Sequence, residues 1–386
     1  MPELSVWFLA SGAASVAFLA FWLYKKRCRV RAGIKQLAAA LKDRNLKDKI
    51  VLVTGANSGL GRELSLELAK REAQVYLACR DLGKAESAVE WIARRCDQED
   101  VQDRLKPVQL DLASLASVKM FAEQFHSVVP RLDVLVNNAA VASCPFALSA
   151  DQLELQYAVN HLGHFQLTNL VLDLLKRSPD ARILVVSSGY YIKGKPDWTN
   201  VDSSSVTSYN RWAAYARSKL ANCLHALELA SRLNGTNVGV YAIRPGFVPS
   251  TDLGRHHSQL LHILSYPIMW AIGRSISEGI QSYLHCCLED KQKLHSGSLY
   301  NNCELEKWQA DKVNPQAAED LWRISEEQIK ARLGQNEESG GSGEEGSWTG
   351  NETGTETGTG DNGTGNGNGN GNGNGNDEEW EKLVKE

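Results

Sequence analysis

Short apolar runs alternate with longer amphipathic stretches between residues 49 and 333 of the chain. The runs are continuous in Val, Ile and Leu, as strands buried on both faces are: KIVLVTG, QVYLAC, LKPVQLDL, LDVLVNNA, RILVVSS and VGVYAIRPG. The stretches between them repeat apolar residues every three to four positions, which predicts helices over Arg62–Glu72, Lys84–Arg95, Ser114–Phe125, Asp151–Leu175 and Tyr215–Leu233. We expect Ser298–Tyr300 to add a last edge strand and Glu319–Leu333 a closing helix. Strands that alternate with helices predict an α/β fold with a doubly wound parallel sheet.

The N-terminus carries the pattern of a membrane anchor. Leu4–Tyr24 is 21 residues without a charged side chain, long enough to cross a bilayer as a helix. Basic residues follow at once from Lys25 to Arg31, and no Lys or Arg precedes Leu4, unlike in a cleaved signal peptide. The positive-inside rule then places the rest of the chain in the cytosol. We expect residues 1–33 to hold the protein in the endoplasmic reticulum membrane, with the mitochondrial membrane, or secretion after cleavage, as alternatives. A buried amphipathic helix or an uncleaved presequence would also explain the apolar run.

The composition changes near the C-terminus. From Gln335 to Glu386 the chain has 12 acidic and 2 basic residues and 15 of its 32 glycines. We expect this acidic Gly/Asn-rich tail, residues 335–386, to be disordered, with its end DEEWEKLVKE as a possible helix on a protein partner. The body, residues 34–334, is then mildly basic, and nothing in its charge indicates nucleic-acid binding. The eight cysteines include no CxxC pair and no Cys/His cluster at zinc spacing, so we expect no metal site.

A glycine-rich turn, TGANSGLG, follows the first predicted strand and opens the first predicted helix. Gly55 allows the tight exit from the strand, Gly59 lets the backbone approach a pyrophosphate, and Gly61 lets helix and strand pack closely. The helix N-terminus then presents free N–H groups to the anion. This context predicts a dinucleotide site that also includes the intervening residues Asn57, Ser58 and Leu60.

The ends of the other strands indicate which dinucleotide binds. The second strand ends with Cys79 and Arg80, where an acidic residue would repel a 2′-phosphate and an arginine can bind one. NADP is therefore favoured over NAD, although Asp81, a candidate helix N-cap, weakens the preference. In open parallel sheets the ligand lies across the carboxyl ends of the strands, so we also expect contacts from Asp111, Leu112, Asn137, Ala139, Pro245 and Gly246, with Ser250 or Thr251 at the carboxamide.

Seven motifs occur in a fixed order: TGANSGLG, LDL, NNAA, the Asn of YAVNHLGHF, VVSS, YARSK and RPG. This order resembles the short-chain dehydrogenase/reductase family, and YARSKLAN, VNHLGHF and LACRD are similar to its retinol-dehydrogenase branch. The resemblance implies a single Rossmann-type catalytic domain over residues 49–333. It also implies a catalytic tetrad of Asn160, Ser188, Tyr215 and Lys219 that transfers hydride between a nicotinamide and an alcohol or aldehyde. In the family the Asn orders a water that relays protons to the Lys, and the Ser binds the substrate oxygen. Read alone, Asn160 could be a satisfied polar residue of a buried helix, and Ser188 an ordinary strand-end serine.

Two YxxxK strings compete for the catalytic pair. Tyr191–Lys195 contains Gly194 and precedes Pro196, so its two side chains are not expected to share a helical face. Tyr215 and Lys219 lie one turn apart in an amphipathic helix, and we choose them; Tyr191 is then a substrate-loop residue or a chance match. A phenol is a poor acid or base near neutral pH, so we expect the ammonium of Lys219 to lower the pKa of Tyr215.

The substrate is expected to be lipophilic. Leu260–Ile272, LLHILSYPIMWAI, is apolar and follows the last cofactor motif, where this fold builds its substrate lid; packing as a core helix explains the pattern equally well. The family resemblance implies retinol and retinal, with a steroid or another lipid as the alternative substrate. A catalytically silent scaffold that recruits partners through its tail is the alternative from another class.

Overall fold

The computed structural model describes residues 39–98, 100–198, 209–249 and 273–340, together with 25, 28, 31–34 and 36. Within these ranges no helix is both long and apolar enough to cross a membrane. The predicted anchor Leu4–Tyr24 and the predicted lid Leu260–Ile272 lie outside the described residues, as does the tail beyond Gly340.

An eight-stranded sheet forms the middle layer of the fold, with the strand order β3-β2-β1-β4-β5-β6-β7-β8. All neighbours are parallel except β7 and β8, so the predicted doubly wound parallel sheet is confirmed. The strands are β1 (Ile50–Thr54), β2 (Gln74–Cys79), β3 (Leu105–Gln109), β4 (Val134–Asn137), β5 (Ala181–Val186), β6 (Val238–Arg244), β7 (Ser298–Asn301) and β8 (Glu304–Glu306).

The edge of the sheet differs from the prediction. β7 was expected to be the last strand, but β8 pairs with it antiparallel and takes the edge position. Asn302 and Cys303 both adopt positive φ, 57° and 65°, which is the backbone of a two-residue hairpin turn. β8 is short and largely polar, and so it lacks the apolar run by which the other strands could be recognised.

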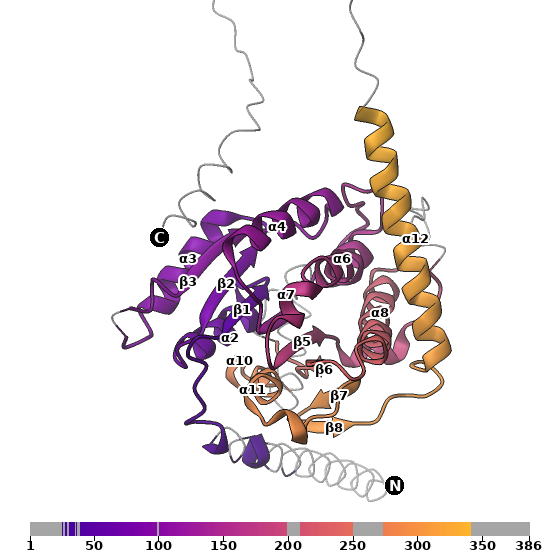
Figure 1. Cartoon of the computed structure of the whole chain (residues 1–386). Helices are drawn as coiled ribbons and strands as arrows, with labels where there is room; N and C mark the ends of the chain where they lie inside the picture. The colour runs from indigo at the N-terminus through magenta and orange to yellow at the C-terminus, as the bar shows by residue number, and fades with distance from the viewer. Residues whose placement is uncertain are drawn as a thin grey trace, which may run out of the picture.

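Helices cover both faces of the sheet (Figure 1). One apolar core lies beneath α2 (Gly59–Ala69), α3 (Leu82–Ala93) and α11 (Gln281–Leu288), next to the short α10 (Ile276–Gly279). The other lies beneath α4 (Leu115–Val128), α6 (Gly163–Leu170) and α8 (Arg211–Arg232), with α12 (Pro315–Gly340) packed outside α8. α12 continues past the boundary at residue 334 that the sequence analysis placed between domain and tail. Local sequence sets several starts: Asp81, Ser114 and Asn210 accept hydrogen bonds from backbone N–H groups in the first turn of α3, α4 and α8.

The stretch predicted as one helix, Asp151–Leu175, is four shorter elements. They are α5 (Leu155–Tyr157), the π-helical turn η1 (Ala158–Leu162), α6 and α7 (Leu172–Lys176). The helical path begins only after Glu154, whose carboxylate caps the N–H groups of Gln156 and Tyr157. Inside it, the imidazole Nδ1 of His164 is 3.1 Å from the carbonyl oxygen of Asn160 and competes with the regular helical hydrogen bonds. A π-turn is a common signature of a functional site, and this one contains Asn160.

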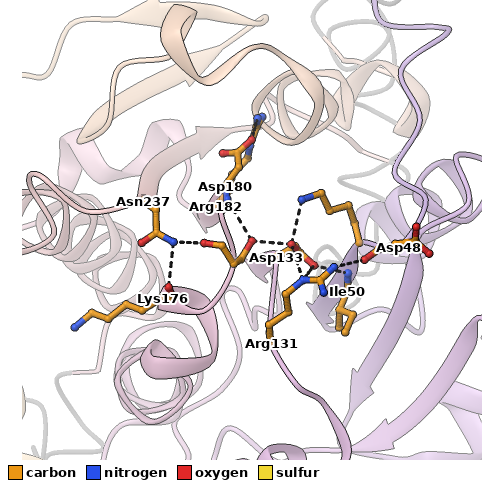
Figure 2. Close-up of polar contacts among 10 residues, drawn as sticks. Asp48, Ile50, Arg131, Asp133, Lys176, Asp180, Arg182 and Asn237 are labelled. Carbon is orange, nitrogen blue, oxygen red and sulfur yellow. Dashed lines mark hydrogen bonds and ion pairs between the residues drawn. The ribbon is translucent and has the colours of Figure 1, made fainter.

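A buried carboxylate joins the strands at the end of the sheet away from their carboxyl termini (Figure 2). Asp133 accepts hydrogen bonds from the Ile50 N–H at 2.9 Å and the Ser178 hydroxyl at 2.6 Å. Lys49 and Arg131 form ion pairs with it at 3.2 Å and 3.1 Å. Burial alone would raise the pKa of Asp133, but these hydrogen bonds and the Lys49 charge outweigh it and hold the pKa below its usual value. The starts of β1, β4 and β5 are thereby held together in register.

Candidate active site

A cavity of about 1120 Å³ opens at the carboxyl ends of the parallel strands. Its walls contain the glycine-rich turn after β1, the strand ends of β2, β4, β5 and β6, and the start of α8. The volume exceeds the range of about 300–1,000 Å³ typical for a single small-molecule site, so it has room for a cofactor and a second molecule.

The glycine-rich turn has the shape that a bound dinucleotide requires. Gly55 has φ of +65°, and a Cβ there would lie 2.8 Å from the Cα of Ala139. A Cβ on Gly61 would lie 2.7 Å from the Asn138 side-chain nitrogen. Ser58 precedes α2 without capping it through its side chain, and no acidic residue stands in the first turn. No acidic residue of its own first turn neutralises the positive end of α2, which faces the cavity, and the residues there fit a pyrophosphate.

Most of the predicted cofactor residues line this one cavity. They are Gly55, Asn57, Ser58, Gly59, Leu60, Gly61, Arg80, Asp111, Leu112, Ala139, Tyr215, Lys219, Pro245 and Gly246. Asn137 is the exception: it is buried, is not among the residues that line the cavity, and donates from Nδ2 to the Thr168 hydroxyl at 2.8 Å. Because β4 is extended, successive side chains alternate between faces, and Asn138 lines the cavity instead. The predicted carboxamide contacts Ser250 and Thr251 lie outside the described residues.

Two cations lie where the end of β2 meets the cavity. Arg80 and Lys84 both line it, together with Asp81. Asp81 caps α3 by accepting from the Lys84 N–H at 3.1 Å, which confirms the predicted N-cap, and it pairs with the Lys84 ammonium at 3.3 Å. The carboxylate is thus engaged by its own helix.

Tyr215 and Lys219 lie on the same face of α8 and reach the cavity together. Both are buried, and the Lys219 Nζ is 5.9 Å from the centroid of the Tyr215 ring. Lys219 donates to the Val186 carbonyl at the end of β5 at 3.0 Å, which fixes the ammonium beside the strand. Tyr191, of the competing YxxxK string, is a buried core residue that packs edge-on against Trp308 and is not among the residues that line the cavity, which favours the chance-match interpretation.

The pKa values of this pair differ from the expectation. Burial raises the pKa of Tyr215, the nearby Tyr190 adds to the effect, and a hydrogen bond with Ser188 opposes it without reversing it. Burial also lowers the pKa of Lys219 to about 8. The predicted lowering of the Tyr215 pKa by Lys219 is therefore wrong for the protein by itself, because desolvation of the phenolate outweighs the other effects.

The two serines at the end of β5, Ser187 and Ser188, make different contacts. Ser187 donates to the Lys219 backbone carbonyl at 2.8 Å and so supports α8. Ser188 lines the cavity and hydrogen-bonds with Tyr215, which places its hydroxyl where a substrate oxygen would meet the phenol. The geometry agrees with the choice of Ser188.

Asn160 acts on the site from behind the cavity wall. It is buried and does not line the cavity. Its side-chain oxygen accepts from the Val141 N–H at 2.8 Å, and its nitrogen donates to the Val141 carbonyl and to the Ser218 hydroxyl, both at 2.9 Å. Asn160 thus joins the loop after β4 to α8, where its partner Ser218 is the neighbour of Lys219. The alternative of a satisfied polar residue in a buried helix describes its side chain correctly.

A hydrogen-bonded group that the sequence patterns did not predict holds β1 against β4. The Thr54 hydroxyl lies 2.8 Å from Nε2 of His164 and accepts from the Asn138 and Ala139 N–H groups at 2.9 Å and 3.0 Å. Burial lowers the pKa of His164 to about 3, so the ring is neutral. Its Nδ1 faces a carbonyl and carries the proton, which leaves Nε2 to accept from Thr54. His164, the second His of VNHLGHF, was the one feature of the sequence that could have indicated this contact.

These features combine a Rossmann-type nucleotide site with a Tyr–Lys–Ser group in one cavity, and the comparisons with known proteins show the family. The family model of the short chain dehydrogenases matches residues 49–260. Human retinol dehydrogenase 14 is 40% identical over 331 residues, 82% of this chain and 97% of the relative. Human retinol dehydrogenase 12 is 41% identical over 74% of this chain and 88% of its own. Bovine dehydrogenase/reductase SDR family member 13 is 40% identical over 76% and 77%.

The solved structures show the same fold. A crystal structure from Mycobacterium paratuberculosis is 31% identical, with a TM-score of 0.59 over 75% of this chain and 97% of that one. A short chain dehydrogenase from Shigella flexneri, complexed with NADP, is 22% identical with a TM-score of 0.50 over 67% of this chain and 98% of that one. The chain belongs to the short-chain dehydrogenase/reductase family, whose members bind a nicotinamide cofactor, and it is a retinol-dehydrogenase-like oxidoreductase. From the sequence we expected DLASLASV, PRLDVLVNNA and the polar C-terminal extension to carry a resemblance to family member 13.

Proposed function

We propose that this protein is a membrane-anchored, NADPH-dependent reductase of lipophilic aldehydes, with retinal as the leading substrate and retinol as the product. One observation carries the proposal: the uncapped N-terminus of α2, Arg80, and the Tyr215–Lys219–Ser188 group line a single cavity. The retinol dehydrogenases among the relatives supply the substrate class. The predicted anchor Leu4–Tyr24 supplies the membrane, with the endoplasmic reticulum as the first location to examine.

The residues of the cavity divide the work of binding and proton transfer. The bound nicotinamide dinucleotide supplies or accepts the hydride. The N–H groups at the start of α2 bind the pyrophosphate, and Arg80 and Lys84 bind the 2′-phosphate that distinguishes NADP from NAD. Ser188 donates a hydrogen bond to the substrate carbonyl oxygen, and Tyr215 donates the proton that this oxygen needs.

The protonation state of Tyr215 in the cofactor-free protein is the one that reduction requires. Burial raises the pKa of Tyr215, so the phenol keeps its proton at neutral pH and is ready to donate it. Oxidation of an alcohol would instead need the phenolate. We propose reduction with NADPH as the direction near neutral pH, and the same membranes offered NADP with retinol measure the reverse reaction.

The test compares membranes that contain the full-length protein with membranes that contain Tyr215→Phe. NADPH or NADH is offered with all-trans-retinal, a series of medium-chain aldehydes and a keto-steroid. We expect NADPH-dependent reduction of retinal that falls about 10²- to 10⁴-fold in Tyr215→Phe, the range for loss of a general acid. Binding of NADPH, followed by its fluorescence, should persist in the variant. Reduction of the keto-steroid alone would favour the steroid alternative, and absence of NADPH oxidation with every carbonyl would reject the proposal.

A further inference from the structure

Two half-exposed aromatic rings stand beside the catalytic tyrosine. Tyr190 lies in the short 3₁₀ helix η2 (Gly189–Lys193) that follows Ser188, and Trp212 lies in the first turn of α8. Their rings stack with centroids 5.1 Å apart and planes at 19°. Tyr190 is 36% and Trp212 37% exposed, and both line the cavity that contains Tyr215. We call this stacked pair the aromatic wall.

The aromatic wall is fixed relative to the reacting atoms. The Tyr190 ring meets the Tyr215 ring edge-on at 5.9 Å and 61°, and the Trp212 ring meets it at 6.3 Å and 78°. The Tyr190 N–H donates to the Ser188 hydroxyl at 3.3 Å, and the Trp212 N–H donates to the Asn210 side chain at 3.0 Å. Each ring is therefore tied to an element that also carries a catalytic group. A carbonyl within reach of Tyr215 has the atoms next to it close to these rings.

The polar groups that hold the start of α8 keep Trp212 in this place. Tyr209 donates to the buried Glu154 carboxylate at 2.7 Å, and the Gln156 side chain donates to the Arg211 carbonyl at 3.0 Å. The chain on either side of Asn210 is thus bonded to the elements next to η1. Aromatic rings held in this way lose little conformational freedom when a ligand packs on them.

We propose that the aromatic wall is the specificity element of the site, and that it selects carbonyl compounds conjugated to a flat unsaturated chain over saturated ones of equal length. The inference rests on the proposed function, since it assumes that an aldehyde binds at Tyr215. Flat π systems gain from contact with aromatic faces beyond the area that they bury. A rigid conjugated chain also loses less rotational freedom on binding than a saturated chain does. Lys193 adds to the same surface, with its ammonium 5.2 Å from the Tyr190 ring centroid.

The test uses two aldehydes of the same length, 2,4-decadienal and decanal, with membranes that contain the wild-type protein, Trp212→Leu or Tyr190→Leu. The quantity compared is the ratio of kcat/KM for the dienal to kcat/KM for decanal, so that any difference in intrinsic reactivity cancels between proteins. We expect this ratio to fall about three- to tenfold in each leucine variant, with most of the change in KM, because a binding surface acts on the ground state and the transition state alike. Trp212→Phe keeps a ring and should keep most of the ratio.

The outcomes separate the two proposals. An unchanged ratio in both leucine variants, with wild-type activity present, overturns the inference and leaves the proposed function standing. Equal loss with both aldehydes at an unchanged KM for NADPH would also overturn it, because the rings would then only support Tyr215. A wild-type protein that reduces neither these aldehydes nor retinal overturns the proposed function, and the inference with it.

Discussion

Burial moves the pKa values of two neighbouring side chains of α8 in opposite directions. The neutral form is favoured in both cases, so the pKa of Tyr215 is raised and that of Lys219 falls to about 8. Lys219 has no carboxylate partner among the described residues, and a backbone carbonyl, that of Val186, accepts its hydrogen bond. A buried, unpaired ammonium costs stability, and a protein retains it where function requires it.

Lys219→Met should therefore stabilise the cofactor-free protein near pH 7 while abolishing reductase activity. The buried charge costs about 3 kcal/mol at most, from the difference between the pKa of about 8 and the ordinary value of 10.5. The Val186 carbonyl keeps a donor, since the Asn222 side chain bonds to it at 2.9 Å. The unfolded chain takes up this proton first as the pH falls from 10.5 to 8, so wild-type stability declines over that window and then stays lower.

Urea unfolding at pH 7 and pH 10.5 measures this effect. We expect the variant to be more stable than wild type at pH 7, with the difference much smaller at pH 10.5. A variant less stable than wild type by the same amount at both pH values would contradict the explanation. Asn222→Leu is the matched control, because it removes the other donor to Val186 without removing a charge.

Replacing Arg80 tests whether the protein prefers NADP to NAD. Arg80→Gln removes the guanidinium that faces the cavity, so KM for NADPH should rise about tenfold or more, the usual loss for a charge-assisted hydrogen bond. KM for NADH, which has no 2′-phosphate, should change less than twofold. Arg94→Gln is the control, because Arg94 is the C-cap residue directly after α3 and is not among the residues that line the cavity. An equal rise for both cofactors would place Arg80 outside the 2′-phosphate site.

Individual contacts were the hardest part to predict from sequence. The glycine turn and the Tyr215–Lys219 spacing are local patterns, and the cavity contains both. Thr54 and His164 come together from β1 and α6, and that contact exists only once the sheet has formed. The sequence alone does not show whether Asn137 or Asn138 faces the cavity, because the register of the strand decides on which side each side chain lies.

At the scale of elements, local sequence shows where some helices start, but it does not show where a helix is interrupted. Asp81 and Ser114 are side chains that cap a helix locally, and both helices begin directly after them. The break inside Asp151–Leu175 could not be read from periodicity, because it depends on hydrogen bonds of individual side chains, one to the loop after β4 and one within the helical path itself. The Asn160 side-chain oxygen accepts a hydrogen bond from the Val141 N–H, and the Asn160 backbone carbonyl contacts Nδ1 of His164.

The network around Asp133 gives a prediction about how strands are joined. Asp133→Ala should destabilise the protein by about 3 kcal/mol, because it removes the carboxylate that Lys49, Arg131 and Ser178 share. The folded-state pKa of Asp133 lies below its usual value, so its contribution is complete above pH 4 and is lost as the pH falls through the folded pKa.

Thermal and urea unfolding at pH 7 and pH 3 would measure both effects. The difference between wild type and Asp133→Ala should shrink at the lower pH. Asp173→Ala provides the comparison, since its ion pair with Arg177 is half exposed and contributes at most about 1 kcal/mol. Equal losses in the two variants would mean that Asp133 is no more than a surface charge.

At the scale of the whole molecule, the alternation of strands and helices was enough to predict the class of fold. Each of the six apolar runs became a parallel strand; five of them are buried almost throughout, as strands covered on both faces are, whereas β3 lies at the edge of the sheet and is partly exposed. β8 was not predicted because it is short and polar and so has no apolar run. The closing helix was expected from Glu319 and begins at Pro315, but nothing in its sequence showed which surface it covers.

That surface is the outer side of α8, and the contact provides a test of how the C-terminal helix supports the site. Trp322 packs edge-on against Phe165 of α6 at 4.7 Å between ring centroids, and Arg232 of α8 lies 4.3 Å from the Trp322 ring centroid. One turn along, Ser325 lies 3.0 Å from the imidazole of His161, the neighbour of Asn160.

Trp322→Ala should cost about 3–5 kcal/mol of folding stability and lower the melting temperature by several degrees. Arg323→Ala, on the exposed side of the same turn, should cost less than about 0.5 kcal/mol. Because α12 reaches the π-turn through Ser325, we also expect Trp322→Ala to lose reductase activity at temperatures below its own unfolding transition, whereas a loss of activity that only follows unfolding would make α12 a cover without influence on the site.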